Sequence, residues 1–357
     1  MVPRRCGAIV DNPGTRTAQV DRQAAGRLQR LLFGAGITQA ISAVAALGIP
    51  DLLMDGPRSC AELAAATRTH EPTLYRVLRV LAGEGVLAQD ERDDFGLTSV
   101  GNLLRSDCVG SQRASAIMKG SPWEWAAWGV FRSSVEDGQT AFRHAHGLAL
   151  FDYLHGHPDA AAIFNDMMTG LTSAKCDAIL RAYDFSGVGT YADVGGGHGV
   201  LMARALAAYP GMHGILFDLP SVAEGARPRL QAAGVADRCR VVGGSFLEAV
   251  PIGGDLYSLV SVLLNWEDGQ AETILRACHA AMQGRGRLIV VDWLVPPGSD
   301  PHPSKYLDLQ MLVLFGGRQR TEPQFADLLT RSGFKVSRVI GTPAGFSIIE
   351  AAPSPAG

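Results

Sequence analysis

The sequence lacks a strong excess of either charge, and it has few lysines. Its 357 residues carry a formal net charge of −3, and the only lysines are Lys119, Lys175, Lys305 and Lys335. A protein that binds nucleic acid in general needs a basic surface, because it has to neutralise phosphate groups. The charge balance therefore argues against a general polyanion binder and against nucleic acid as a partner.

The sequence also lacks paired cysteines and long apolar runs. Its six cysteines are scattered with no Cys-x-x-Cys pair, so neither a metal site nor a disulfide framework is expected. No apolar run reaches the ~18 residues of a membrane-spanning helix, and the N-terminus has no signal-peptide segment. The scattered cysteines make a reducing cytoplasm the expected location, and 47% apolar with 19% charged residues is typical of a globular protein, whose length of 357 residues allows two or three domains without a membrane partner.

A strand–turn–helix–strand pattern between Tyr191 and Asp218 is the most informative stretch. The apolar strand Tyr191–Val194 leads into the glycine cluster Gly195–Gly199, a helix-like run follows, and a second strand, Gly214–Phe217, ends at Asp218. Glycines let a backbone turn tightly and approach a ligand without a Cβ in the way. An acid at the end of the second strand can accept hydrogen bonds from both ribose hydroxyls. The pattern predicts a βαβ unit that holds a nucleotide-like ligand.

The residues around the glycines bear on which nucleotide is bound. An NAD-type fingerprint has the form Gly-x-Gly-x-x-Gly, and Gly195-x-Gly197-x-Gly199 lacks the third glycine at the required place. Asp193 also puts a carboxylate where it would repel a dinucleotide pyrophosphate. A cationic ligand with an amino group suits that carboxylate better. The turn therefore favours S-adenosylmethionine, and a plain strand-to-helix turn is the alternative.

The N-terminal part is expected to be helical after a tail. Residues 1–24 mix Pro, Gly, Thr and Arg, and they are expected to form a disordered or loosely attached tail. Apolar residues then recur at helical spacing over residues 27–53. Two short helices, over 59–67 and 71–85, and a hairpin-like stretch over 86–97 follow. This succession suggests a winged helix.

A winged helix can bind DNA or mediate a protein–protein contact. Its second helix, Thr73–Ala82, offers Arg76 and Arg79 as cations, while Glu71 and Glu84 flank it. So sparse a basic surface favours a protein–protein module over a DNA-binding regulator.

Aromatic and methionine side chains concentrate between residues 113 and 185, which are expected to form helices. They include Trp123, Trp125, Trp128, Phe131, Phe142, Phe151, Tyr153, Phe164, Met167 and Met168. Most are expected to pack between domains. An aromatic cluster beside a cofactor domain is also suited to line a pocket for a flat apolar substrate.

The α/β pattern continues after Asp218. Strands are expected over 240–242, 256–263 and 287–291, with a helix over 272–282. Ligands of open α/β sheets bind at the carboxyl ends of the strands. Several residues fall at such ends, namely Asp193, Asp218, Ser245, Phe246, Leu264, Asn265, Trp266 and Asp292. Their coincidence predicts a ligand site at this edge of a Rossmann-like sheet.

Several short blocks occur in the order and spacing of a known family. They are Phe151-Asp152-Tyr153-Leu154, Phe164-Asn165-x-x-Met168, Asp193-Val194-Gly195-Gly196-Gly197-His198-Gly199, Phe217-Asp218-Leu219-Pro220, Val262-Leu263-Leu264-Asn265-Trp266 and Asp308-Leu309-x-Met311-Leu312 with Gly316-Gly317-Arg318-x-Arg320-Thr321. With these blocks the chain resembles the small-molecule O-methyltransferases, which include plant caffeate-type and bacterial polyketide-tailoring enzymes. The resemblance covers about residues 30–350.

The resemblance implies a fold and a domain order. It implies a class I, Rossmann-like methyltransferase domain over 186–357, preceded by an all-α, winged-helix-like dimerisation domain over 25–112. A helical linker over 113–185 would line the substrate pocket. The chain would form a homodimer through its N-terminal domain.

The resemblance also implies roles for individual residues. Asp193, Gly195 and Gly197 would face the methionine part of S-adenosylmethionine and Asp218 the ribose, and Leu219 would also bind the cofactor. Ser245 and Phe246 would flank the adenine, although the family usually has Asp at Ser245, and Ser261 and Thr172 would lie nearby. The remaining candidates, for the wall of the substrate pocket, are Phe164, Met168, Trp266, Met311, Phe315 and Trp128.

The chain departs from the family at Leu264, where most members have a histidine that takes the phenol proton. Leucine cannot accept a proton, so that mechanism is unavailable. Asp292 matches one acid that steadies the histidine, while Gln319 stands in the place of the other. Asn265 is the candidate to orient the phenol oxygen. The candidate proton acceptors are His146, His144 and Tyr153, and each histidine could equally be structural.

The sequence leaves two enzymatic functions open. The first is in-line methyl transfer from S-adenosylmethionine to a phenol of a polycyclic aromatic polyketide, in which proximity supplies much of the rate. The second keeps S-adenosylmethionine intact and uses its charge to stabilise an anion during decarboxylation, hydroxylation or a pericyclic step. The Leu-Asn-Trp pattern at 264–266 resembles the anthracycline-tailoring branch, which contains enzymes of both kinds.

Overall fold

The structure is a computed structural model that describes residues 13–108 and 110–354. Its contacts divide the chain after Ser106 into two compact units. No helix of the described residues is long and apolar enough to cross a membrane.

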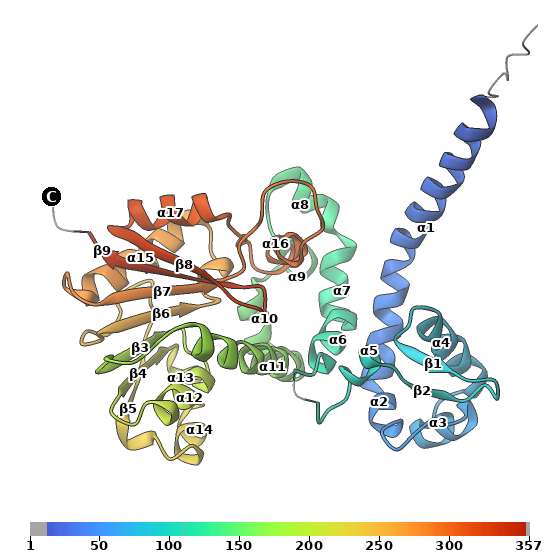
Figure 1. Ribbon diagram of the computed structural model, residues 1–357, viewed down its shortest axis with the longest axis horizontal. Coiled ribbons are helices and arrows are strands. Elements are labelled where there is room, and N and C mark those ends of the chain that lie inside the picture. Colours follow the sequence, from blue (N-terminus) through green and yellow to red (C-terminus); the bar gives the residue numbers. More distant parts are fainter. Residues whose placement is uncertain (1–12, 109, 355–357) are drawn as a thin grey trace, which may run out of the picture. The chain divides into compact units, whose positions relative to one another are not determined.

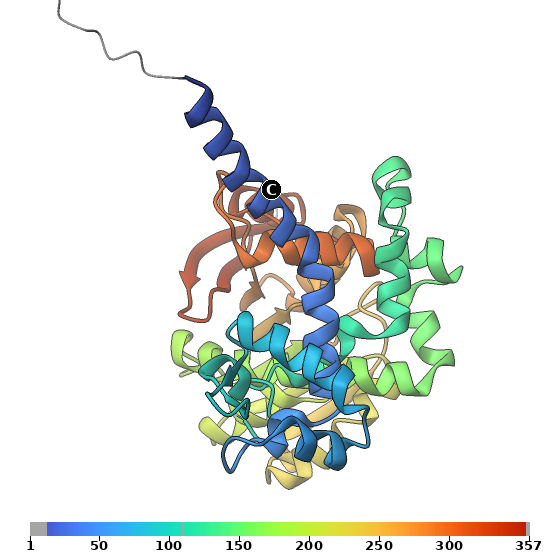
Figure 2. The same cartoon turned by 90° about the vertical axis from the view of Figure 1, so that its right-hand side faces the viewer.

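The N-terminal unit consists of helices and one hairpin. Its elements are α1 (Pro13–Ala46), α2 (Ile49–Leu52), α3 (Cys60–Thr67), α4 (Glu71–Gly83), β1 (Leu87–Gln89), β2 (Phe95–Leu97) and α5 (Ser99–Asn102). Figure 2 shows α1 as one long continuous helix in dark blue. Helix α1 begins at Pro13, within the stretch 1–24 that is expected to form a tail, and residues 1–12 lie outside the described residues.

The helix expected over 27–53 is divided at Gly48. This glycine adopts a left-handed conformation, with φ of 69°, and α2 begins directly after it. The two short helices and the hairpin are confirmed. Ser59 forms a reciprocal capping box with Glu62 at the start of α3, and β1 pairs with β2 in antiparallel register, Leu87 opposite Leu97.

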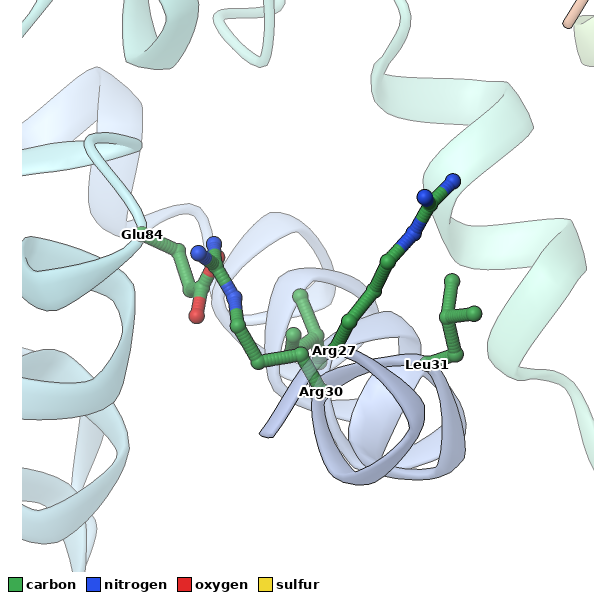
Figure 3. A pocket seen from close by; sticks show the side chains of 5 residues that line it. Arg27, Arg30, Leu31 and Glu84 are labelled. Carbon is green, nitrogen blue, oxygen red and sulfur yellow. The ribbon is translucent and has the colours of Figure 1, made fainter. Parts of the chain in front are cut away.

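A surface hollow of this unit lies between α1 and the end of α4. Figure 3 shows Arg27, Arg30 and Leu31 of α1 around it, with Glu84 on the facing side. Arg30 and Glu84 form an exposed ion pair at 3.7 Å. Exposed pairs contribute little to stability.

The C-terminal unit contains a seven-stranded sheet in the order β5-β4-β3-β6-β7-β9-β8. The strands are β3 (Thr190–Val194), β4 (His213–Asp218), β5 (Cys239–Gly243), β6 (Leu256–Val260), β7 (Arg287–Asp292), β8 (Phe334–Gly341) and β9 (Ser347–Pro353). The first five are parallel, and β9 runs antiparallel to both of its neighbours. The βαβ unit is confirmed, whereas β6 ends three residues before the expected Leu263.

Helices cover both faces of this sheet (Figure 1). One face packs against α15 (Asp268–Met282) and α17 (Glu322–Arg331), and the other against α11 (Pro158–Ala182), α12 (Val200–Ala208) and α14 (Arg227–Ala232). On β7, Leu288 and Val290 face the first layer while Ile289 and Val291 face the second. Burial on both faces explains why the central strand β7 has a continuous apolar sequence.

The remaining helices form a cap at one end of the sheet, as Figure 1 shows for α7–α10 and α16. They are α6 (Arg113–Gly120), α7 (Pro122–Gly129), α8 (Phe131–Asp137), α9 (Ala141–His146), α10 (Leu150–Gly156) and α16 (Pro303–Leu314), and α13 (Pro220–Glu224) follows β4. The helical character expected over 113–185 is confirmed. Because α16 follows β7 in the chain, it brings distant residues next to the helices that precede the sheet.

Candidate cofactor and substrate site

The glycine turn after β3 requires glycine for two separate reasons. Gly195, Gly197 and Gly199 have φ values of 73°, 56° and 72°, a conformation that costs other residues free energy. Space is the second reason at Gly195, where an added Cβ would lie 2.7 Å from Cγ2 of Val262 and 3.6 Å from Cε1 of Phe246. The backbone of the turn therefore lies directly against the ends of neighbouring strands.

Asp218 binds this turn. The N–H of Gly197 donates to its Oδ2 at 2.8 Å, and the N–H of Leu219 donates to its Oδ1 at 2.7 Å. Burial raises the pKa of Asp218, while these two backbone donors oppose the rise. Leu219 itself is 53% exposed. The acid thus stands beside the glycine turn and bonds to its backbone.

Asp193 lies beneath the turn. It is 2% exposed, and its Oδ1 accepts a hydrogen bond from Ser258 Oγ at 2.6 Å. Ser258 also bonds to the hydroxyl of Tyr191 at 2.7 Å. An added Cβ at Gly196 would lie 2.8 Å from Asp193 Oδ2, so this oxygen supports the turn from below. Burial raises the pKa of Asp193 to about 6.

The expected adenine side lies at the ends of β5 and β6. Phe246 packs edge-on against Trp266 with ring centroids 5.8 Å apart, and Ser245 Oγ accepts from the N–H of Leu247 at 3.3 Å. Trp266 packs against the sheet core together with Phe246. The predicted pocket residue Trp266 thus lies next to Phe246, which is expected to flank the adenine.

Leu264 occupies a 3-10 turn, Leu263–Asn265, directly after β6. It is 7% exposed. The side-chain amide of Asn265 donates to the carbonyl of Ser261 at 3.5 Å. A Cβ at Gly317 would lie 2.1 Å from the carbonyl oxygen of Leu264, so the loop after α16 touches this turn through its backbone.

Arg320 holds the same turn in place. Its guanidinium donates to the carbonyls of Leu263 and Trp266, both at 2.9 Å, and to Oδ1 of Asp268 at 2.8 and 3.0 Å. The side chain is 1% exposed. In the sequence, Arg320 stands out only as part of the motif Gly316–Thr321. A buried arginine needs fixed acceptors, but the sequence does not show which ones.

Asp292 is the last residue of β7, and its two carboxylate oxygens have different surroundings. Its Oδ1 accepts from the N–H of Trp293 at 2.8 Å, whereas Oδ2 is buried and has no hydrogen-bond partner among the described residues. Burial raises its pKa to about 6, and the positive charge of Lys175 opposes that rise. Gln319 lies next to it, and its buried side-chain amide also lacks a partner in the described part of the chain.

Ser261 and Thr172 stand near a residue that sequence reasoning missed. Nζ of Lys175 donates to Oγ of Ser261 at 2.6 Å, and Ser261 has a positive φ of 55°. Thr172 Oγ1 donates to the carbonyl of Met168, one turn back on α11. The available signals were the scarcity of lysines and the three-residue spacing from Thr172, which places Lys175 on the same helix face.

Aromatic side chains meet in the helical cap. Phe164 of α11 lies with its ring centroid 6.3 Å from that of Phe315, which follows α16, and Phe151 contacts both. Trp128 and Met168 pack against the same cluster. Met311 is buried on α16. The structure thus brings together Phe164, Phe315, Trp128 and Met168 of the predicted pocket residues.

The predicted proton acceptors lie within the cap. Nε2 of His146 bonds to the carbonyl oxygen of Trp123 at 2.8 Å. A nitrogen that faces a carbonyl must carry hydrogen, so Nε2 cannot take a proton there. His144 pairs with Asp137 at 3.1 Å, and Tyr153 stacks on His157. Within the described residues, no group of three His, Cys, Asp or Glu side chains could hold a metal ion.

The sheet order and the glycine turn with its acid define a class I methyltransferase. Comparison with known families gives the particular group: residues 128–335 match the model of the O-methyltransferase domain, and residues 29–107 match the O-methyltransferase dimerisation domain. The chain therefore belongs to the O-methyltransferase family and is an S-adenosylmethionine-dependent enzyme. Its dimerisation domain supports a homodimer.

Individual relatives align with this chain along most of their length. The phenazine O-methyltransferase of Lysobacter antibioticus is 43% identical, covering 91% of this chain and 95% of the relative. The aclacinomycin 10-hydroxylase of Streptomyces purpurascens is 35% identical, and the match covers 87% of this chain and 86% of that relative. The solved mitomycin 7-O-methyltransferase is 37% identical, with a TM-score of 0.87 over 94% of this chain and all of that one.

A further structure bears on the ligands of the family. An O-methyltransferase from neocarzinostatin biosynthesis was solved in complex with S-adenosylmethionine and 2-hydroxy-5-methyl naphthoic acid. It is 29% identical, with a TM-score of 0.76 over 88% of this chain and 95% of that chain.

Proposed function

We propose that this enzyme methylates a phenolic hydroxyl of a polycyclic aromatic metabolite of polyketide type, in antibiotic biosynthesis. One observation carries the proposal. The backbone contact between Gly317 and Leu264 joins the aromatic cluster to the cofactor side of the sheet, because Phe315 lies only two residues before Gly317. Relatives named for phenazine, mitomycin and naphthoate substrates support a flat aromatic acceptor.

The residues around the glycine turn fit S-adenosylmethionine. Asp218 would hold the ribose, Gly195 and Gly197 would let the methionine part approach, and Phe246 with Ser245 would flank the adenine. Thr172 and Ser261 would lie beside the methionine part. When bound, the cofactor supplies an electrophilic methyl group.

The chain itself positions the acceptor. Phe164, Phe315, Met168, Trp128 and Met311 would hold a flat ring system, with Trp266 on the cofactor side. Holding the phenol oxygen in line with the methyl group would supply much of the rate. Asn265 would orient that oxygen, and the Asp292 carboxylate would steady positive charge nearby. For His146 the bond to Trp123 favours a structural role in the cap.

The proposal extends to the domains and their setting. Residues 25–112 would form the dimerisation domain, 113–185 would line the pocket, and 186–357 would bind the cofactor. Light scattering of the full chain against a variant truncated before residue 113 would test whether the homodimer depends on the N-terminal domain. We place the enzyme in the cytoplasm, without nucleic acid, membrane or metal partners.

A labelled-cofactor assay tests the reaction. The enzyme is incubated with isotopically labelled S-adenosylmethionine and a panel of polycyclic phenols, including anthracycline 15-carboxylic acids. Label in the product, with an equal amount of S-adenosylhomocysteine, supports methyl transfer. A product of changed mass without label, formed only when the unconsumed cofactor is present, would instead establish the decarboxylation or hydroxylation function. Two observations favour this second function. One is the similarity of the chain to aclacinomycin 10-hydroxylase, and the other is the apolar Leu264 where most family members have their histidine base.

A further inference from the structure

The site described above has no proton acceptor where its family has one. Leu264 is apolar, and Nε2 of each cap histidine is engaged, with the carbonyl of Trp123 at His146 and with Asp137 at His144. Phenol methylation requires loss of the phenol proton, and general base catalysis contributes typically about 100- to 10,000-fold. A basic group elsewhere at the carboxyl edge of the sheet would restore that contribution.

Lys175 is a nitrogen base at this edge. It extends from α11, one turn after Thr172, and reaches Oγ of Ser261 at 2.6 Å at the end of β6. Asp292, at the end of the adjacent β7, acts on it electrostatically. Lys175 is largely buried and keeps only a minor exposed surface. The other cations near this edge are engaged: Arg320 with Asp268 and two carbonyls, and Arg204 with Asp177.

We propose that Lys175 is the general base of the methyl transfer, with Ser261 positioning its amine and Asp292 stabilising its ammonium form. The neutral Nζ takes the phenol proton and becomes an ammonium group. The phenolate oxygen forms a bond to the methyl carbon as the carbon–sulfur bond breaks. The electron pair of that bond stays on sulfur, which loses its positive charge. The ammonium then returns its proton to solvent.

The surroundings of Lys175 suit this role. Burial lowers its pKa, so the neutral amine is available at a lower pH than for an exposed lysine, while Asp292 and, more weakly, Cys176 oppose the shift. The negative charge of Asp292 favours the ammonium once it forms. Lys175 and Asp292 would thus take the parts that a histidine base and its steadying acid take in most members of the family.

The inference rests on the proposed O-methylation, and its test uses a series of phenols of graded acidity. We expect Lys175→Met and Lys175→Arg to lower kcat about 100-fold or more with a weakly acidic phenol, and less than about 10-fold with a strongly acidified one. Arginine keeps the charge but cannot accept a proton. Calorimetric titration should show the Kd for S-adenosylmethionine within about threefold of wild type in both variants. Lys335→Met, at an exposed position on β8, is the matched control.

Other results would overturn the assignment. If Lys175→Arg keeps the wild-type kcat while Lys175→Met loses cofactor affinity, Lys175 anchors the cofactor and is not the base. A loss of kcat that is the same for every phenol would show a structural role, which thermal unfolding of each variant checks independently. If wild-type enzyme transfers no label to any phenol, the proposed function fails, and the binding titrations still report whether Lys175 contacts the cofactor.

Discussion

The N–H of Gly197 donates a hydrogen bond to Oδ2 of Asp218 at 2.8 Å, so the acid that ends β4 also holds the glycine turn that follows β3. Leu219 donates to the other oxygen at 2.7 Å. One carboxylate therefore shapes the turn and remains beside the expected ribose position. Its two backbone donors require an acceptor at both oxygens.

Asp218→Asn tests this double requirement. The amide has one acceptor oxygen, so its NH₂ group would face either Gly197 or Leu219 with two donors opposed. We expect the Kd for S-adenosylmethionine to rise about tenfold or more, with a smaller change in kcat at saturating cofactor. Isothermal titration calorimetry measures the affinity. An unchanged Kd would remove Asp218 from the cofactor site.

Gly195→Ala and Gly197→Ala form a matched pair. Both positions have positive φ, which costs alanine about 1–2 kcal/mol, but an added Cβ would clash with Val262 only at Gly195 and would meet nothing within 4 Å at Gly197. We expect Gly195→Ala to lose both stability and cofactor binding more strongly. Urea unfolding and calorimetry of the two variants check the order, and equal losses would contradict the steric argument.

Arg320→Met should destabilise the enzyme strongly. The substitution leaves Oδ1 of Asp268 and the carbonyls of Leu263 and Trp266 without their donor, while Oδ2 of Asp268 keeps Arg318 and Arg331 nearby. Breaking a buried ion pair by removing one partner costs about 3–5 kcal/mol, and the lower end applies because Asp268 is partly exposed. Arg320→Lys should recover part of the loss through its charge. Urea unfolding at neutral pH measures both, with the exposed Arg132→Met as control.

The pH dependence of stability should change in Asp292→Asn. Burial raises the folded-state pKa of Asp292 to about 6, above the unfolded value of about 3.9. The protonated carboxyl therefore contributes stability that is fully present below about pH 4 and is lost as the pH rises through about 6.

We expect Asp292→Asn to gain stability relative to wild type between pH ~4 and ~6, by up to about 3 kcal/mol, and to stay level above pH ~7. Urea unfolding at each pH checks this, with Asp300→Asn in an exposed loop as control. A constant difference across the range would mean that Asp292 titrates normally.

Much of the fold follows from local sequence patterns. Continuous apolar runs predicted the strands around Asp193 and Asp218, because burial on both faces of a parallel sheet requires them. The turn after β3 was also predictable, since its positive φ values select glycine. Boundaries were less accurate: α1 begins at Pro13 inside the expected tail, and β6 ends before its apolar run does, where the chain enters the turn at Leu264.

The sequence by itself determined the cofactor half of this enzyme, because strand, glycine turn and acid lie within one short stretch and their requirements are local. Only the tertiary structure decided the surroundings of the reacting group. Lys175 and Ser261 are 86 residues apart, and Arg320 lies 57 residues from the carbonyl of Leu263 that it binds. Such contacts depend on how sheet and helices pack, and no periodicity or spacing encodes them.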